Sequence, residues 1–320
     1  MSTMRALGLD APGSLDTLSV RDLPIPEPGP GAVRLRVARS ALNPADLKVL
    51  TGDFFGRFLH GREVPIVTGY DLAGTVDAVG PGADLAVGDR VFGHLAYAGD
   101  TKRGAFAQFA VAPADSLAKI PDGVTEETAA AAATAGLTAL QALRDKGSLP
   151  SGGRALIVGA SGGVGSLAVG VASRLGAEVT AICSTHAVTL VESLGADRVI
   201  DRKKEEPLTG GPYDVVLDTP GVHSYGAVAK ILSPTGAYVT TLPSPAFALG
   251  KLRTLFSSRT CEFVVVQSKR ADLELIGGWL ADGMQAPVDS RYPVTELKDA
   301  LEALAAGGRT GRIVIDVSTL

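Results

Sequence analysis

The chain has 320 residues, of which 46% are hydrophobic and 20% are charged, and its formal net charge is −4. A chain of this length and composition has enough apolar residues for one large domain or two smaller ones. Because the net charge is negative and indicates no basic surface, we expect no nucleic-acid partner. Because no uninterrupted apolar stretch reaches membrane-spanning length, we expect no membrane partner either. Only two cysteines occur, which offers no disulfide framework and favours a cytoplasmic protein.

The first 120 residues are rich in short apolar runs that proline and glycine separate. This pattern predicts a small, twisted, barrel-like β domain. The strands expected here are 33–37, 66–67, 74–79 and 90–92. One helix is expected to interrupt them after Asn43, with Pro44 in its first turn.

A different pattern begins at Thr125, where an N-cap residue and two acids lead an alanine-rich helix to about Arg144. From Arg154 onward strands and helices alternate, which predicts a parallel sheet with right-handed crossovers in doubly wound order. Its six strands are expected at 154–158, 177–183, 198–200, 213–218, 236–241 and 262–266.

The last part of the chain is expected to pack back on the first. Helices are predicted at 271–281 and 295–305, and strands at 288–292 and 312–317. We therefore predict a discontinuous domain of residues 1–122 and 287–320, and a second domain of residues 123–286.

The segment from Arg154 to Gly165 carries the strongest chemical signal. An apolar strand leads into the turn A-x-G-x-x-G, formed by Ala160, Gly162 and Gly165, and the turn opens an apolar helix over 166–175. Glycines there let backbone N–H groups approach a pyrophosphate at the positive end of the helix. The candidate cofactor-binding residues of the turn are Ser161, Gly162, Gly163 and Val164.

The end of the second strand of this unit indicates which dinucleotide binds. An acid usually holds the adenosine ribose of NAD at this point, and residues 181–186 contain none. Ser184, Thr185 and His186 instead offer hydrogen-bond donors, and Arg202 adds a cation just past the third strand. Because a 2′-phosphate needs donors and repels carboxylates, these residues predict NADP(H).

Several further motifs follow one another along the chain. They are 43–46, 64–76, 87–93, 135–139, 159–165, 194–197 and 308–313. In this order they resemble the medium-chain dehydrogenase/reductase superfamily, and within it the zinc-free quinone oxidoreductase (zeta-crystallin-like) branch. The resemblance implies an α/β fold: a Rossmann doubly wound parallel sheet, a GroES-like, β-barrel-type catalytic domain built from both chain ends, and an active site in the cleft between them.

The same resemblance implies further properties. Thr138 matches a family position near the nicotinamide, and Arg312 is expected to bind the cofactor as well. Relatives suggest a homodimer, which exposed ladder groups of the edge strand near 262–266 would form.

The zinc-dependent branch of the superfamily differs at its metal ligands. Where those relatives carry Cys or His, this chain has Asn43, Tyr70 and the 133–135 region. The histidines, at positions 60, 94, 186 and 223, show no ligand spacing, and a structural zinc site needs four clustered cysteines. We therefore predict no metal.

Without zinc nothing strongly acidifies an alcohol, but NADPH can still deliver hydride to a conjugated carbonyl. Quinones, enones and 2-enoyl thioesters are small-molecule substrates of this kind. The candidate catalytic residues are Asn43 for the substrate carbonyl or nicotinamide ribose, Lys48 as a donor or 2′-OH contact, and Tyr70 as a nearby phenol. Phe54 stands where relatives place a tyrosine and cannot donate a proton, so solvent is an alternative proton source.

The sequence leaves three functions open. A fourth, a zinc alcohol dehydrogenase, is the weakest hypothesis. The first is an NADPH-dependent reductase of conjugated carbonyls. The second is a 2-enoyl-thioester reductase of fatty-acid or polyketide metabolism, for which Lys251, Arg253 and Arg259 would supply a basic patch. The third is a non-catalytic NADPH-binding sensor or structural protein, which the phenylalanine at position 54 keeps open.

Overall fold

A computed structural model describes residues 2–61, 63–97, 103–242 and 244–320. Its contacts divide the chain into two compact units, which we call unit 1 (Met1–Thr134 and Ser268–Leu320) and unit 2 (Ala135–Gln267). These divisions lie 12 and 19 residues from the predicted domain limits at 122 and 286, because the first half of one helix and all of another pack on unit 1. The predicted limits themselves stay a prediction.

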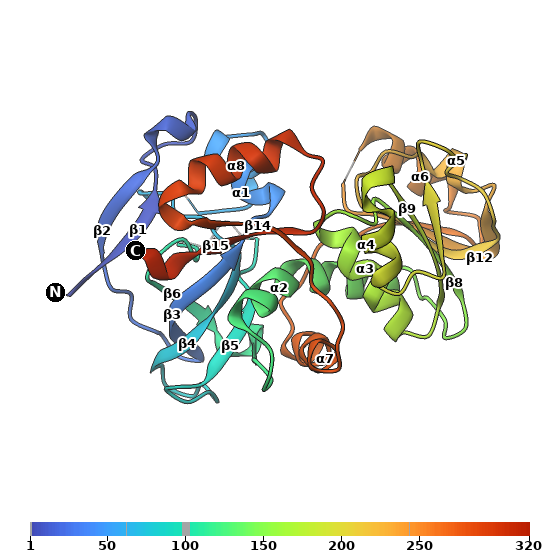
Figure 1. The fold of residues 1–320 in the computed structure, drawn as a ribbon. Coiled ribbons are helices and arrows are strands. Elements are labelled where there is room, and N and C mark those ends of the chain that lie inside the picture. Colours follow the sequence, from blue (N-terminus) through green and yellow to red (C-terminus); the bar gives the residue numbers. More distant parts are fainter. Residues whose placement is uncertain (1, 62, 98–102, 243) are drawn as a thin grey trace. The chain divides into compact units, whose positions relative to one another are not determined.

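Unit 1 is built around a seven-stranded mixed sheet in the order β14-β15-β3-β4-β5-β7, with β6 pairing with β3 and a separate β1-β2 pair (Figure 1). Its strands are β1 (Thr3–Gly8), β2 (Ser19–Pro24), β3 (Ala32–Ala41), β4 (Asp71–Val79), β5 (Arg90–His94), β6 (Phe109–Pro113), β7 (Leu117–Lys119), β14 (Val288–Pro293) and β15 (Arg312–Asp316). Its helices are α1 (Pro44–Thr51), the first part of α2 (Glu126–Leu140), α7 (Arg270–Ala281) and α8 (Leu297–Ala306).

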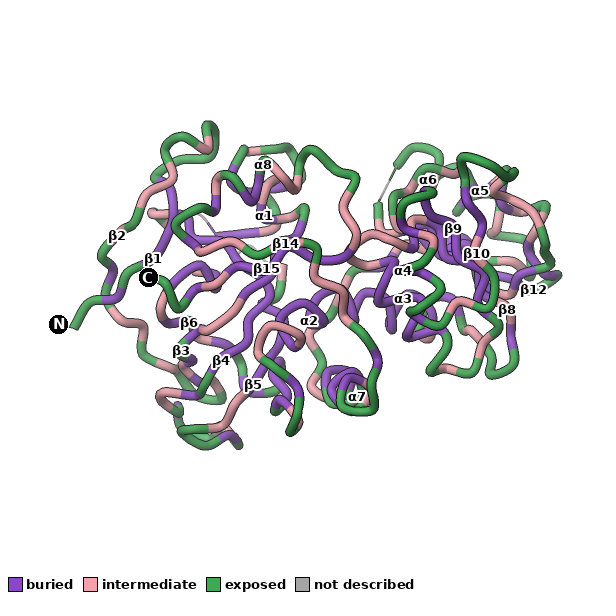
Figure 2. Tube along the Cα trace, in the orientation of Figure 1, coloured by how far each residue is buried: buried purple, intermediate pink, exposed green. Residues whose placement is uncertain are grey.

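The two ends of the chain meet in this sheet. Strand β15 pairs antiparallel with β3, with Val314 opposite Ala41 and Ile315 opposite Ser40. Residues from both ends, such as Leu35 and Leu301, share one buried core, and the purple segments of Figure 2 follow it along β3, β4 and α8.

Local capping signals set the ends of α1 and the start of α2. Asn43 caps α1 in a capping box with Asp46, and the helix ends at Gly52 in the left-handed region, with φ 75°. Thr125 caps α2 by accepting a hydrogen bond from the Thr128 N–H at 3.1 Å. After Leu140 the helix widens into a π-helical turn, Gln141–Lys146, which the sequence pattern did not predict.

Unit 2 contains the predicted parallel sheet, in the order β10-β9-β8-β11-β12-β13. Its strands are β8 (Arg154–Val158), β9 (Glu178–Cys183), β10 (Arg198–Asp201), β11 (Tyr213–Asp218), β12 (Leu232–Thr240) and β13 (Thr260–Phe263), and its helices are α3 (Gly163–Arg174), α4 (Val188–Ser193), α5 (Tyr225–Val228) and α6 (Pro245–Arg253). Helix α3 packs on β8 and β9, and α4 on β10 (Figure 1). The doubly wound order is confirmed.

A few predicted elements were wrong in extent. The 66–67 run forms only an isolated bridge between Ile66 and Leu9. Strand β12 begins at Leu232, four residues before the predicted start, and β13 ends at Phe263, before most of the predicted run. None of the described helices is long and apolar enough to cross a membrane.

Candidate functional site

The dinucleotide turn follows β8 in unit 2. Gly159 turns the chain with φ 75°, and the Ala160 N–H donates to Ile182 O of β9 at 3.0 Å. A Cβ on Gly165 would lie 2.1 Å from Gly159 O, so only glycine allows the first turn of α3 to close on the strand end. The sequence motif and the observed backbone therefore agree at each glycine that the turn requires.

The start of α3, which follows this turn, has the features of an anion-binding site. The N-cap residue, Gly162, has no side chain that could accept a hydrogen bond from the first N–H groups of the helix, and the first helical turn contains no acid. The earliest N–H groups of a helix lack partners within it, and the helix dipole adds positive potential there. The half-buried residues 161–164 fit a pyrophosphate, since a Cβ on Gly162 would find only Gly159 O, at 3.4 Å, and the space beside it is open.

The residues predicted to select NADP(H) come from the ends of β9 and β10. Arg202 donates through its backbone N–H to Cys183 O and through Nε to Ser184 Oγ, at 3.0 and 2.9 Å. Thr185 and His186 are exposed in the short turn that follows Ser184. The structure thus brings Ser184 and Arg202 into contact beside Thr185, while their role in binding a 2′-phosphate stays a prediction.

An acid that the sequence reasoning did not weigh lies in the same place. Asp201 is buried at the end of β10 and accepts hydrogen bonds from Thr185 Oγ1 at 3.1 Å and the Lys203 N–H at 3.0 Å. Lys204 Nζ lies 3.5 Å from its other oxygen. Asp201 Oδ1 is thus occupied, whereas Oδ2 is buried with no hydrogen bond among the described residues and faces Lys204. Arg202 is exposed beside this buried acid.

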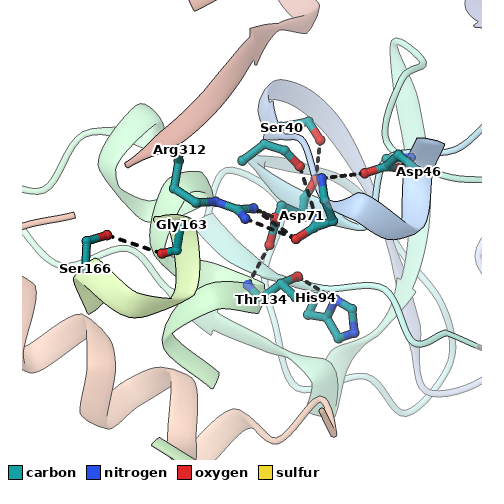
Figure 3. Close-up of polar contacts among 11 residues, drawn as sticks. Ser40, Asp46, Asp71, His94, Thr134, Gly163, Ser166 and Arg312 are labelled. Atoms are coloured by element: carbon teal, nitrogen blue, oxygen red, sulfur yellow. Dashed lines mark hydrogen bonds and ion pairs between the residues drawn. The ribbon is translucent and has the colours of Figure 1, made fainter. Parts of the chain in front are cut away.

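A buried polar cluster in unit 1 contains one predicted catalytic residue, Asn43, and one predicted cofactor-binding residue, Arg312. Asn43 is 3% exposed, and its Nδ2 donates to Asp71 Oδ2 at 2.8 Å while its Oδ1 accepts from both terminal nitrogens of Arg312 at 3.1 Å. Arg312 also forms an ion pair with Asp71, and the Thr134 N–H donates to Asp71 Oδ1 at 2.6 Å (Figure 3). Asn43 is therefore held by residues that lie 28 and 269 positions away.

Asp46 anchors the same cluster to the backbone. Its carboxylate accepts the Asn43 N–H at 2.8 Å and the Gly69 N–H at 2.7 Å. Burial raises its pKa to about 7, although these two hydrogen bonds act in the opposite direction. The residue fixes the start of α1 against the segment that leads into β4.

Tyr70 lies in an aromatic group with His60, Tyr97 and His94. Its hydroxyl donates to Leu59 O at 3.2 Å and lies 3.2 Å from His60 Nδ1, and burial raises its pKa, so it keeps its proton. The Tyr97 ring centroid lies 4.6 Å from that of Tyr70 and 4.7 Å from that of His94. Burial lowers the pKa of His94 to about 3, and its Nδ1 lies 2.7 Å from Thr134 Oγ1, so this ring is neutral near pH 7.

The other predicted residues of the site lie apart from this cluster. Lys48 Nζ lies over the Phe55 ring, 5.8 Å from its centroid, and Phe54 packs against Phe55 at the surface. Thr138 is buried in the interior of α2. Their catalytic or cofactor roles, like those of Asn43, Tyr70 and Arg312, stay predictions.

The sequence reasoning missed Asp71, Thr134, His94 and Tyr97. Asp71 had a signal, because a carboxylate between two apolar neighbours, Tyr70 and Leu72, must find a partner when buried. The other three had none, since their role depends on contacts between distant segments.

The donor set of the cluster does not fit zinc. An amide, a phenol and a hydroxyl stand at Asn43, Tyr70 and Thr134, and the Asp71 carboxylate that Asn43 contacts is paired with Arg312. Over the described ranges of the chain, no three His, Cys, Asp or Glu side chains group as metal ligands. The two cysteines are buried, and burial raises the pKa of each thiol to about 11.

A doubly wound sheet with a glycine turn at its first strand defines a dinucleotide-binding fold. Two family profiles match this chain: "Alcohol dehydrogenase GroES-like domain" over residues 29–122 and "Zinc-binding dehydrogenase" over residues 194–315. The chain belongs to the medium-chain dehydrogenase/reductase superfamily, whose members are oxidoreductases that bind nicotinamide cofactors. The predicted family and its two-part α/β fold are thereby confirmed.

Individual relatives are similar over nearly the whole chain. The trans-enoyl reductase pgmF of Aspergillus terreus is 32% identical over 314 residues, covering 90% of this chain and 87% of the relative. The chloroplast envelope quinone oxidoreductase homolog of Arabidopsis thaliana is 32% identical over 310 residues, covering 92% of each. The structure of the quinone oxidoreductase from Coxiella burnetii superposes with a TM-score of 0.87 at 26% identity, covering 98% of this chain and 99% of that one.

Proposed function

We propose that this protein is an NADPH-dependent reductase of conjugated carbonyls that works without zinc. The observation that carries the proposal is the pairing of a pyrophosphate-binding turn with the Ser184–Arg202 contact. The guanidinium is held at the end of β9, where an NAD-specific protein of this fold carries an acid. The proposal agrees with the likeness to proteins described as quinone oxidoreductases.

Each part of the cofactor would have its own set of residues. Residues 161–164 would hold the pyrophosphate, and Ser184, Thr185, His186 and Arg202 the 2′-phosphate. NADPH supplies the hydride when bound. Hydride addition to the β-carbon of an enone places negative charge on the carbonyl oxygen, so the protein must offer a donor there, and a proton must reach the α-carbon.

The three predicted catalytic residues differ in what they can offer to that oxygen. The Asn43 amide and the Tyr70 hydroxyl are already hydrogen-bonded inside unit 1. The Lys48 ammonium is half-exposed beside Phe55 and retains N–H donors. We therefore assign the contact with the developing charge to Lys48, positioning to Asn43 and Tyr70, and the proton on carbon to solvent.

A 2-enoyl-thioester reductase is the second candidate, which the likeness to a trans-enoyl reductase favours. The basic patch expected for it is weaker than the sequence indicated. Lys251 is paired with Glu262, and Arg259 donates to Ser233 O and Leu232 O at 2.9 and 3.0 Å. Of the three candidates, Arg253 keeps its charge exposed without such a contact among the described residues.

Oxidation of NADPH against a panel of acceptors tests these proposals. We expect turnover with quinones and alkyl enones, a lower rate with crotonyl thioesters, and a much lower kcat/KM with NADH. Preference for thioesters would favour the second candidate. Tight NADPH binding without turnover on any acceptor would favour a sensor or structural protein.

We also propose a homodimer and keep a cytoplasmic location as a proposal. Strand β13 forms the edge of the unit 2 sheet, and Leu252, Phe256 and Val265 are exposed near it in the chain. An open strand edge beside apolar side chains favours pairing with a second copy. Sedimentation should show twice the chain mass, reduced to one chain by Phe256→Asp, and a parent protein that is only monomeric would contradict the dimer.

A further inference from the structure

Unit 1 contains a cavity of about 570 Å³ that the proposed reaction does not yet use. Its walls come from the loop after β1 (Pro12), the end of α1 (Val49) and the segment from Gly56 to Ile66. Gly56 closes onto α1, since a Cβ there would meet Lys48 O at 2.1 Å. The volume is within the range of small-ligand pockets.

The cavity adjoins a predicted catalytic residue. His60 lines it, and His60 Nδ1 lies 3.2 Å from the Tyr70 hydroxyl. A molecule in the cavity would therefore be one side chain away from Tyr70.

Three exposed phenylalanines flank the part of the wall that Gly56 and Arg57 form. Phe54, Phe55 and Phe58 are 67%, 51% and 65% exposed, and Phe54 packs edge-on against the other two at centroid distances of 5.5 and 5.7 Å. Large aromatic side chains clustered in water cost free energy and mark ligand or partner sites. Beside a cavity they suit an apolar arm of a ligand.

The charged residues of the cavity wall indicate the charge of the ligand that it would bind. Arg57 lines the cavity, is exposed, and enters no ion pair in the part of the chain that the structure describes. The acid of the wall, Asp10, is paired with Arg21 at 2.9 Å. An uncompensated guanidinium beside an apolar mouth is complementary to an anion that carries an apolar chain.

We propose that this cavity binds the apolar arm of the acceptor and that Arg57 binds an anionic group on that arm. The inference rests on the proposed function and narrows its substrates to amphipathic enones or enoyl compounds with a carboxylate or phosphate. Neutral quinones would use the reaction site without Arg57.

Matched acceptors test the proposal through turnover. One is a long-chain alkyl enone, the second the same chain ending in a carboxylate, the third the same chain ending in a phosphate, and p-benzoquinone is the small neutral control. We expect the anionic enones to have at least tenfold higher kcat/KM than the neutral enone. Arg57→Gln should remove this tenfold advantage of the anionic enones and leave kcat/KM for p-benzoquinone unchanged, whereas Arg57→Lys should retain most of the advantage. Arg5 is an exposed arginine elsewhere in unit 1, and Arg5→Gln should have no effect on any acceptor.

Phe58→Ala should lower kcat/KM for all three long-chain enones and leave p-benzoquinone unchanged. Equal rates for the charged and neutral enones in the parent, or an equal loss for all acceptors in Arg57→Gln, would overturn the proposal. The carboxylate and phosphate arms then show which anion the site prefers.

Binding without turnover separates this inference from the proposed function. Isothermal titration calorimetry of the full chain should detect decanoate but not decanol, with decanoate binding lost in Arg57→Gln and weakened by added salt. If no acceptor is reduced but decanoate binds in this way, the reaction is wrong and the cavity site stands. If acceptors are reduced but decanoate does not bind, the cavity proposal fails alone.

Discussion

Asp71 joins three segments of unit 1 that are far apart in the sequence. It is fully buried, it is paired with Arg312, and Asn43 and Thr134 satisfy its remaining acceptor positions. Two charges removed from water cost several kcal/mol each, which such a pair offsets only when its other hydrogen bonds are made. Removal of one partner should therefore be much more damaging than removal of both.

Arg312→Met should lower the free energy of unfolding by about 3–5 kcal/mol, because Asp71 is left as a buried, unpaired acid. Urea unfolding measures the loss. The double variant with Asp71→Asn should recover part of it, and Arg5→Met, an exposed arginine of β1, should stay within about 0.5 kcal/mol of the parent. A loss in the double variant equal to the sum of the two single losses would contradict the coupling.

Ser184→Asp should reverse the cofactor preference. The new carboxylate would repel the 2′-phosphate and would also pair with Arg202, whose Nε now lies 2.9 Å from Ser184 Oγ. We expect the ratio of kcat/KM for NADPH over NADH to fall at least tenfold, as measured by steady-state kinetics. Thr189→Asp adds the same charge at an exposed position of α4 and should leave the ratio unchanged. A parallel fall in this variant would show that net charge alone is responsible.

Asp46 should make stability fall as the pH rises. Burial raises its pKa from 3.8 to about 7, so between these values the unfolded chain loses this proton while the folded chain keeps it. The contribution is complete below pH 4 and is lost progressively as the pH rises to about 7. Urea unfolding of the parent and of Asp46→Asn at pH 5 and pH 7 isolates the contribution of Asp46. If the stability of the parent relative to Asp46→Asn did not fall from pH 5 to pH 7, the raised pKa of Asp46 would be wrong.

At the scale of elements, local signals were sufficient wherever one segment determines its own structure. Pro44 in a first turn, the glycines after β8 and the β–α alternation predicted α1, the dinucleotide turn and the order of the sheet. The bounds of β12 and β13 and the π-helical turn after Leu140 could not be predicted, because they depend on pairing with other segments. The partners of Asn43 and Tyr70 were likewise hidden, since Arg312 and His60 are brought to them only by the fold.

Two alanine substitutions in the dinucleotide turn should have different effects. In Gly165→Ala the new Cβ would lie 2.1 Å from Gly159 O, so the strand end and α3 must separate, which should cost about 1–3 kcal/mol of stability. In Gly162→Ala the nearest atom lies at 3.4 Å and the φ of −78° suits alanine, so the fold should be retained. NADPH affinity should nevertheless fall about tenfold, because that Cβ takes up space where the pyrophosphate approaches.

Thermal unfolding and a fluorescence titration of NADPH distinguish the two variants. If Gly162→Ala lost stability but not affinity, the turn would have a structural role alone. If Gly165→Ala were as stable as the parent, the close approach of α3 to β8 would be wrong.

At the scale of the whole molecule, the predicted functions are divided between the two units. The residues predicted to bind the pyrophosphate and the 2′-phosphate belong to unit 2, and the predicted acceptor residues and the cavity belong to unit 1. A chain of two compact units need not unfold in one step. Ligands of one unit should therefore shift the unfolding of that unit first.

NADPH should raise the unfolding temperature of this protein more than NADH does at the same concentration. A ligand that binds only the folded state adds about 2.7 kcal/mol at one hundred times its Kd. If the units unfold separately, calorimetry should show this gain in one of two transitions, and Ser184→Asp should transfer it from NADPH to NADH. Equal shifts with both cofactors in the parent would refute the selection of the 2′-phosphate by Ser184 and Arg202, whatever acceptor the enzyme reduces.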